Sequence, residues 1–286
     1  MGLFSELKMA VPWGHIAAKA WGSQKGSPVL CLHGWLDNAN SFDRLIPLLP
    51  RDFYYVAMDF GGHGLSSHYS PGLPYHYQNF VGEIRRVSAG GTVGGMFACM
   101  FPEMVDKLIL LDSSPFALDS NELENLLTYK RKGLEHTLLL EQAAKGPSRV
   151  LSPEEMLQRF LKNNRHVGEE CGKLLLQRGA TQVPTGLVLR RDRRIALPEH
   201  TFDFISKELC VQAIKKLQAH VLLVKATEGF FHVRREKDSD KGPLLFMTDT
   251  LKSALGERFQ YVEVPGNHYV HMNQPDHVAG VVGSFL

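Results

Sequence analysis

Short apolar runs, each bounded by turn residues, recur in the first and last thirds of the chain. Such runs predict strands, and the wholly apolar run Pro28–Leu32 is expected to be buried on both faces of a sheet. They cover Pro28–Leu32, Phe53–Met58, Lys107–Leu111, His220–Lys225 and Gln260–Val264. Nearer the start, Ser5–Val11 and His15–Trp21 flank Pro12, Trp13 and Gly14 and predict a β-hairpin.

Segments with apolar residues at helical spacing separate these strands. They cover Ser41–Leu49, His76–Val87, Leu244–Leu255 and Asp276–Phe285. Because strands that alternate with helices form parallel pairs through crossover connections, the pattern predicts an α/β fold with a mostly parallel sheet.

The middle of the chain has a different pattern, with amphipathic helices and no clear strand run. The predicted helices are Glu122–Leu140, Pro153–Asn163 and Glu169–Leu176. A chain that begins as α/β, becomes helical and returns to α/β indicates an insertion within one parent domain. We therefore expect residues 1–115 and 216–286 to form an α/β core and residues 116–215 to form a helical cap.

Composition and charge exclude several functions. Hydrophobic residues make up 44% of the 286 residues, which is too many for a disordered chain. With 32 Lys and Arg against 30 Asp and Glu, the net charge of +2 offers no general attraction for nucleic acid. No apolar run of about 18 residues predicts a transmembrane segment. The four cysteines are scattered without a CxxC pair, which argues against structural zinc and favours a reduced, intracellular location, most simply the cytoplasm.

Three motifs follow predicted strands, where open α/β sheets bind their ligands. His33-Gly34-Trp35 follows the first run, and the glycine-rich segment from Asp59 to Ser66 follows the second. His268 lies between the last strand and the last helix, in the sequence PGNHYVHMNQP. Taken singly, each motif is also typical of an ordinary turn. His268 and His271 have the spacing of a metal pair, but no acidic or cysteine ligand stands beside them.

In this order the motifs resemble those of the α/β-hydrolase family over nearly the whole chain. The resemblance extends to LHGWLDNANSFDRLIPLLP, FPEMVDKLILLD and LQAHVLLVKA. It implies that His268 is the general base and that the backbone N–H of Trp35 helps to bind an oxyanion. It also implies that Asp59–Ser66 is a structural loop, and it implies no metal or cofactor.

The nucleophile motif departs from the family pattern. The family places its serine in a G-x-S-x-G turn after a central strand. The nearest match here is Ser88 in Arg86-Val87-Ser88-Ala89-Gly90, so Ser88 would be the nucleophile and Ala89 the second oxyanion donor. The predicted helix runs directly into Ser88, and we therefore expect the central strand that carries the nucleophile to be missing. A splice variant or a degenerate gene copy would have such a sequence.

The acid of the triad also departs from the family pattern. The family places it three residues after the glycine that follows the HVLLVK-type strand, and Gly229 puts His232 there. A histidine cannot be the anionic partner of His268. Four acidic residues are alternatives, namely Glu228, Glu236, Asp238 and Asp112. Asp112 directly follows the predicted strand Lys107–Leu111.

Two functions follow from these features. The first is a serine hydrolase that acts on an ester or a related small acyl substrate. The second is a catalytically impaired or non-catalytic derivative with a binding role. A dehalogenase-type reaction needs Asp at the nucleophile position, where Ser88 stands. The arginines from Arg190 to Arg194 lack interleaved aromatic residues and are expected to form a solvated cap loop.

Overall fold

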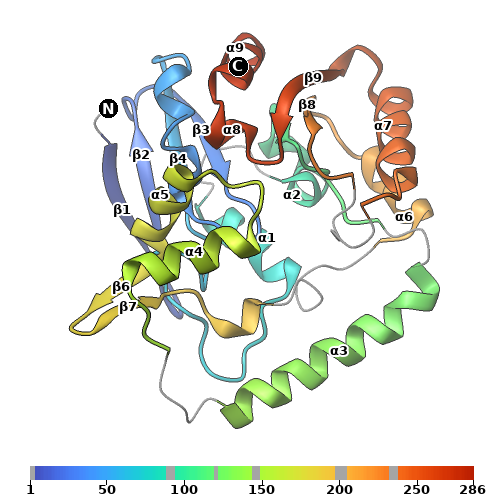
Figure 1. The fold of residues 1–286 in the computed structure, drawn as a ribbon. Coiled ribbons are helices and arrows are strands. Elements are labelled where there is room, and N and C mark those ends of the chain that lie inside the picture. Colours follow the sequence, from blue (N-terminus) through green and yellow to red (C-terminus); the bar gives the residue numbers. More distant parts are fainter. Residues whose placement is uncertain (1–3, 88–93, 119–121, 144–148, 197–204, 232–237) are drawn as a thin grey trace.

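The computed structural model describes residues 4–87, 94–118, 122–143, 149–196, 205–231 and 238–286 (Figure 1). Its strands form two separate sheets that lie side by side, each covered by helices, and a small hairpin in the middle region of the chain. The predicted α/β architecture is confirmed.

The first sheet has the order β1-β2-β4-β3. Strands β1 (Phe4–Val11) and β2 (Gly14–Trp21) form the predicted hairpin, and β2 pairs antiparallel with β4 (Phe53–Met58). Strand β3 (Ser27–Leu32) pairs with β4 in parallel, from Ser27 opposite Phe53 to Leu32 opposite Met58.

The second sheet has the order β5-β8-β9, and all its pairs are parallel. The strands are β5 (Lys107–Leu111), β8 (His220–Glu228) and β9 (Phe259–Asn267). Strand β8 is central and its residues from Val221 to Ala226 are buried, as its apolar run predicts.

No strand of the described residues pairs with the outer edge of β3 or with the outer edge of β5. The expected central strand is therefore missing from the described part of the chain. One expectation about β3 is wrong. The sequence predicts burial on both faces, but the first two residues are exposed and the other four are only half-buried, because no strand of the described residues covers the outer edge.

Two hydrophobic clusters pack on opposite faces of the sheets, as the alternation of side chains along a strand requires. Val221 and Leu223 of β8 contact the first cluster, with α1 (Tyr77–Val87), α2 (Gly95–Met100), α6 (Lys207–Ile214) and α7 (Gly242–Leu255). Leu222 and Val224 contact the second, with α9 (Asp276–Phe285).

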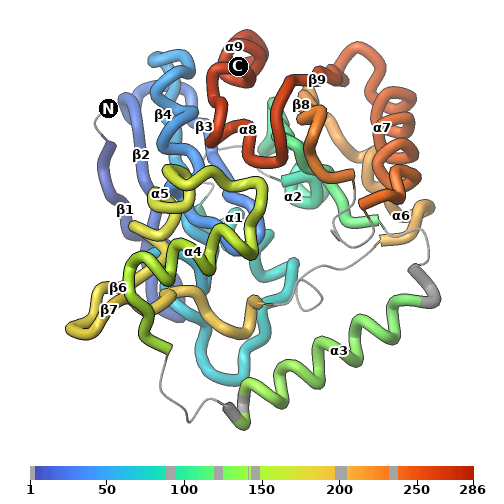
Figure 2. The backbone as a smooth tube through the Cα atoms, viewed as in Figure 1, coloured from blue at the N-terminus to red at the C-terminus, as the bar shows by residue number. Residues whose placement is uncertain are grey.

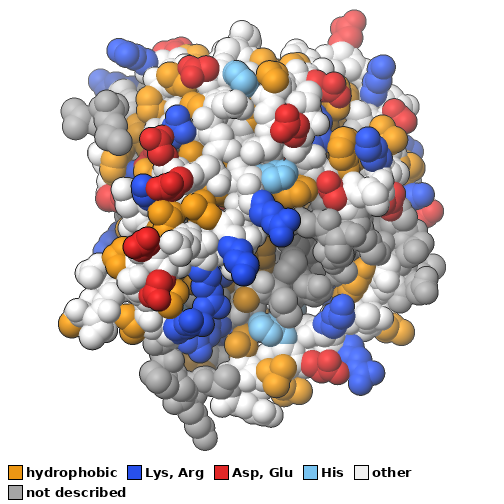
Figure 3. Space-filling model, viewed as in Figure 1, with side chains coloured by type: hydrophobic (Ala, Val, Ile, Leu, Met, Phe, Trp, Pro, Cys, Tyr) orange, Lys and Arg blue, Asp and Glu red, His pale blue; other side chains and the backbone are white. Residues whose placement is uncertain are grey.

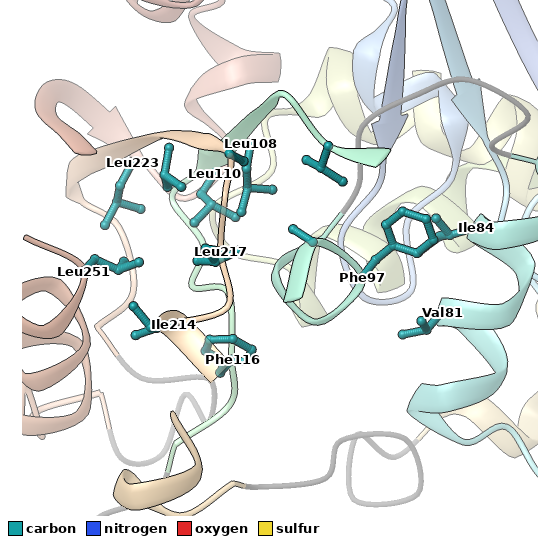
Figure 4. Packing of buried hydrophobic residues seen from close by; sticks show 14 of the residues in the cluster. Val81, Ile84, Phe97, Leu108, Leu110, Phe116, Ile214, Leu217, Leu223 and Leu251 are labelled. Atoms are coloured by element: carbon teal, nitrogen blue, oxygen red, sulfur yellow. The ribbon is translucent and has the colours of Figure 1, made fainter. Parts of the chain in front are cut away.

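The first cluster joins the two sheets. It contains Ile84 of α1, Phe97 of α2 and Leu108 of β5, and Figure 4 shows the Phe97 ring directed toward Ile84, with Leu108 and Leu110 on the other side of α2. Helix packing thus connects the two halves where the described residues provide no strand pairing.

The middle region contains three helices and one feature that the sequence analysis missed. The helices are α3 (Glu122–Ala143), α4 (Pro153–Asn163) and α5 (Glu169–Gly179). Strands β6 (Ala180–Val183) and β7 (Gly186–Leu189) form an antiparallel hairpin, so the expectation of no strand in this region is wrong. Helix α3 lies at the rim of the molecule (Figures 1 and 2).

The cap boundaries at residues 116 and 215 stay a prediction. Helix α6 lies within that range, yet its Cys210 and Ile214 are buried in the cluster that joins the two sheets. In the described ranges, no helix combines the length and apolar character needed to cross a membrane.

Candidate active site

His268 lies in the turn between β9 and the short helix α8 (Val270–Asn273). Gly266, two residues earlier, has a φ of 132°, a backbone conformation that residues other than glycine rarely adopt. A Cβ at this position would also collide with the Val270 side chain. The turn brings His268 to the carboxyl-end edge of the sheet. Its ring is partly exposed and lines the main cavity.

Asp112 follows β5 directly and meets His268 across 156 residues of sequence. The Nδ1 atom of His268 lies 2.7 Å from Oδ2 of Asp112, and this carboxylate is fully buried. With Nδ1 donating to the carboxylate, Nε2 is the ring nitrogen that can accept a proton from a nucleophile.

The second oxygen of Asp112 is also bonded. Oδ1 accepts hydrogen bonds from the buried Lys225 ammonium and from the backbone N–H of Ala226, the latter at 3.0 Å. Burial raises the pKa of Asp112, but the hydrogen bonds from His268 and Lys225 outweigh it and hold the pKa below its ordinary value. Asp112 is therefore ionised at neutral pH.

Gly229 provides the space for this carboxylate. A Cβ at Gly229 would collide with both oxygens of Asp112. The glycine that follows the β8 strand in the sequence is thus required by the close approach of the acid.

The other candidate acids do not contact His268 in the described part of the chain. Glu228 is exposed at the end of β8, and the Asp238 carboxylate accepts a 2.6 Å hydrogen bond from the Phe231 N–H. Glu236 and His232 lie outside the described residues. Of the three candidate acids that the structure describes, Asp112 is the one that lies against His268.

Ser88 and Ala89 also lie outside the described residues. The described chain reaches Val87 at the end of α1 and resumes at Gly94, just before α2. Gly94, Gly95 and Met96 line the same cavity as His268. The roles of Ser88 as nucleophile and Ala89 as oxyanion donor therefore stay predictions.

Trp35 follows β3 and lines the same cavity. The turn after it is tight, since Leu36 has a φ of 67°. His33 supports the turn because its Nε2 accepts a 3.1 Å hydrogen bond from the backbone N–H of Phe60. Burial lowers the pKa of His33, so this histidine is neutral and structural. The oxyanion role of Trp35 stays a prediction.

The Asp59–Ser66 segment is a buried turn. The Asp59 carboxylate accepts hydrogen bonds from the backbone N–H groups of Ala39 and Leu65 and from Nε of Arg178, at 2.7 to 2.8 Å. Because all three partners hold the carboxylate in place, the segment supports the site and links it to α5.

The cavity occupies about 1290 Å³ and opens between the two sheets. Val29–Leu32 of β3 line one side and Lys107–Leu111 of β5 line the other. The volume exceeds the usual range of about 300–1,000 Å³ for small-molecule pockets. Within the described residues no strand pairs with the outer edge of β3 or of β5, and this lack of pairing leaves part of the space between them.

Sequence analysis missed three residues around the site. Lys225 reads as the end of a strand, and Arg191 as part of a solvated loop, yet both line the cavity. His166 stacks on Phe230 with ring centroids 4.3 Å apart, and Phe230 lies 5.1 Å from the His268 ring. No sequence signal marks His166.

The described residues offer no metal centre. They bring together no group of three His, Cys, Asp or Glu side chains that could hold a metal ion. His271, the other member of the candidate pair, is buried, and burial lowers its pKa to about 4.

Comparison with known families and proteins gives the same fold. A family model described as "alpha/beta hydrolase fold" matches residues 27–86, ending two residues before Ser88. The chain is 67% identical to the serine hydrolase-like protein of Mus musculus, over 100% of this chain and 96% of that protein. It is 66% identical to serine hydrolase-like protein 2 of Homo sapiens, over 100% and 95% of the two chains.

These two alignments are longer than the chain. They span 300 and 299 positions against 286 residues, so at least 13 positions of each relative have no counterpart here. That difference is close to the length of a strand together with the end of a helix.

Solved structures cover nearly the whole chain. The hypothetical protein PA1622 of Pseudomonas aeruginosa PAO1 has a TM-score of 0.78 and 26% identity, covering 98% of this chain and 97% of its own. The thioesterase domain from the curacin biosynthetic pathway has a TM-score of 0.78 at 20% identity, covering 99% and 100%, which is a likeness of fold.

Proposed function

We infer the function from family membership, because this chain belongs to the α/β-hydrolase family and, within it, to the serine hydrolase-like proteins. We propose that it hydrolyses an ester or a related small acyl substrate. In this proposal Ser88 is the nucleophile, His268 the general base and Asp112 the acid. Trp35 and Ala89 donate backbone N–H groups to the oxyanion.

The observation that carries the proposal is the 2.7 Å contact between His268 Nδ1 and the buried Asp112 carboxylate. It leaves Nε2 to remove the hydroxyl proton of Ser88 as the oxygen attacks the acyl carbon. His268 then returns that proton to the leaving alcohol, which leaves the acyl group on Ser88. In the second half of the reaction His268 removes a proton from water as the water attacks the acyl carbon, and His268 then returns the proton to the Ser88 oxygen. Asp112 stabilises the imidazolium formed in each step.

A second function is favoured by one specific observation. Strands β3 and β5 have no partner between them in the described residues, and the family presents its nucleophile from a strand at that place. A chain without this support would keep the cavity and the His268–Asp112 pair but would bind acyl ligands without cleaving them.

Labelling with a fluorophosphonate probe separates the two functions. The hydrolase proposal expects covalent labelling at Ser88, found by mass spectrometry of the tryptic peptide and lost in Ser88→Ala. Ser284→Ala, in the exposed last turn of α9, is the control and should label like the native chain. A folded chain without labelling at Ser88 would reject the hydrolase and support the binding function.

A further inference from the structure

The charge around the cavity is uneven. Four arginines from the middle region of the chain line it, namely Arg149, Arg159, Arg191 and Arg193. The acidic side chains of the described residues that line it are Asp37 and Asp112. Asp112 is already paired with Lys225 and His268, and Asp37 accepts a 3.1 Å hydrogen bond from the Tyr269 hydroxyl. Positive charge on this side of the cavity therefore exceeds negative charge.

Arg191 stands out within this group. It is partly buried, whereas the other three arginines are exposed. Its guanidinium makes no hydrogen bond or ion pair within the described residues, and it interacts electrostatically with Asp37 and with the buried His63. Burial lowers the pKa of Arg191, which means that the charged side chain has lost hydration without gaining a bonded partner. The expected solvated loop is therefore wrong at Arg191.

The neighbours of Arg191 in the loop, unlike Arg191, do have hydrogen-bonded side chains. Asp192 is buried and accepts a hydrogen bond from Arg194 at 2.7 Å and one from the Tyr75 hydroxyl at 2.9 Å. Arg194 also donates to the carbonyl oxygen of Tyr69. The backbone N–H groups of Arg190 and Asp192 also donate to the carbonyl oxygens of Gly179 and Gly62, so the Arg191 side chain is presented to the cavity from an ordered segment.

Much of the cavity lining is apolar. It includes side chains from both sheet edges and from the helices between them, namely Leu30, Leu32, Leu108, Leu110, Phe116 and Met96. A ligand that fills this space must therefore bury a hydrocarbon part. Figure 3 shows several Lys and Arg side chains near the middle of the face that carries α4.

We propose that the cavity binds an anionic amphiphile, with its hydrocarbon chain between β3 and β5 and its carboxylate or phosphate head on Arg191, assisted by Arg159. The fork of guanidinium donors matches the oxygens of either head group. This inference deepens the proposed function, since it names the class of acyl ligand, and it rests on the same cavity.

Calorimetric titration of the full chain with three probes of equal chain length tests it. The probes are dodecanoate, dodecyl phosphate and the neutral 1-dodecanol. We expect at least one anion to bind about tenfold or more tightly than the alcohol, as a charge-assisted hydrogen bond predicts. The tighter anion identifies the head group. Equal affinity for the alcohol and both anions overturns the proposal.

Variants locate the head group. Arg191→Gln should weaken the preferred anion about tenfold and leave the alcohol unchanged. Arg159→Gln, on the exposed face of α4, should act in the same direction and does not depend on the packing around Arg191. Arg131→Gln, on α3 and outside the cavity, is the matched control and should change neither affinity. An unchanged preference in both cavity variants, with circular dichroism showing folded protein, contradicts the proposal.

The same preparation should be labelled with the fluorophosphonate probe. Anion binding without labelling removes the hydrolase proposal and leaves this one. Labelling at Ser88 without a preference for the anions removes this proposal and leaves the hydrolase.

Discussion

At the scale of single residues, Asp112 is shared between two side chains, His268 and Lys225. His268 bonds one carboxylate oxygen, and Lys225 and the Ala226 N–H bond the other. In a simple triad the acid serves the histidine alone. Here part of its charge is neutralised by Lys225, which is itself buried beneath the Phe231 ring, 4.8 Å from the ammonium. Lys225 therefore positions the acid and also limits its support for His268.

Replacing the acid tests its role directly. Asp112→Asn keeps the shape but removes the charge that stabilises the imidazolium, so fluorophosphonate labelling of Ser88 should slow by a factor on the order of 10²–10⁴. Glu228→Gln, on the exposed end of β8, is the control and should label at the native rate. If Glu228→Gln slows labelling and Asp112→Asn does not, the acid has been misassigned.

The lowered pKa of Asp112 predicts a pH dependence of stability. A carboxyl group whose pKa is depressed on folding stabilises the native state above its unfolded pKa, about 3.9, and this contribution is lost as the pH falls through the folded pKa. Urea unfolding between about pH 5 and pH 2 should therefore show a shallower loss of stability in Asp112→Asn than in the native chain. Equal slopes would mean that the carboxyl group is not held in its ionised form.

Gly229 gives a steric test of the same contact. In Gly229→Ala the new methyl group would overlap the Asp112 carboxylate, so we expect a loss of about 1–3 kcal/mol in the free energy of unfolding. Gly280→Ala, in α9 with no atom near the added methyl group, should be neutral or slightly stabilising. Similar melting temperatures for the two variants would show that the acid does not lie against Gly229.

At the scale of elements, the sequence predicted the helices and strands whose apolar residues recur at a single helical or strand spacing. Strands β4 and β5 and helices α4 and α9 have the expected bounds. The β6–β7 hairpin was missed because each strand has four residues and β6 is half polar. The predicted helix Ser41–Leu49 is instead two short 3₁₀ turns, Ala39–Phe42 and Ile46–Leu48, and the second contains Pro47, which lacks a backbone donor.

The site could be predicted only in part for a related reason. His268 stands in a recognisable motif, but its pairing with Asp112 depends on how β5 and β9 are placed on either side of β8. Spacing in the sequence cannot distinguish Asp112 from three other acids. Lys225 could not be recognised because a lysine at the end of an apolar run is ordinarily a solvated side chain.

A buried ion pair contributes to the attachment of α5 to the core, beside hydrogen bonds from Asn38 and Asn40. Arg178 is nearly inaccessible and donates from Nε to the fully buried Asp59 and from Nη1 to the partly exposed Glu6. Arg178→Met would leave Asp59 without its counter-charge, so we expect a loss of about 3 kcal/mol or more in the free energy of unfolding. Arg131→Met, which breaks an exposed pair on α3, should cost less than about 1 kcal/mol. Equal losses in urea unfolding would refute the anchoring role.

At the scale of the whole molecule, the decisive feature is the separation of the two sheets. The edges of β3 and β5 face one cavity without pairing in the described residues. The family match ends at residue 86, two residues before Ser88, and each of the two alignments contains at least 13 positions that have no counterpart here. The hydrophobic cluster across α1 and α2 holds the two halves together where the described residues provide no strand pairing.

An insertion tests this account. The insert would have about 14 residues placed before Ser88. It would finish a helix, add a Val/Ile/Leu-rich strand and put a Gly two residues ahead of the serine. We expect the new strand to pair with the outer edges of β3 and β5. Each buried apolar side chain of that strand would contribute about 1.5–3 kcal/mol. The melting temperature should rise, and hydrogen exchange should slow at the half-buried amides from Val29 to Leu32.

The insertion also separates the effects of two departures from the family pattern, the missing nucleophile strand and the histidine at position 232. Labelling at Ser88 should increase when the strand supports it, because Asp112 already contacts His268 and no acid is needed at position 232. Adding His232→Asp to the insertion should therefore leave the labelling rate unchanged. If labelling rises only in the double variant, the acid belongs at position 232 and the Asp112 contact is structural. If exchange from Val29 to Leu32 stays at the native rate with the insert present, the added strand does not pair with β3 and the open edge has another cause.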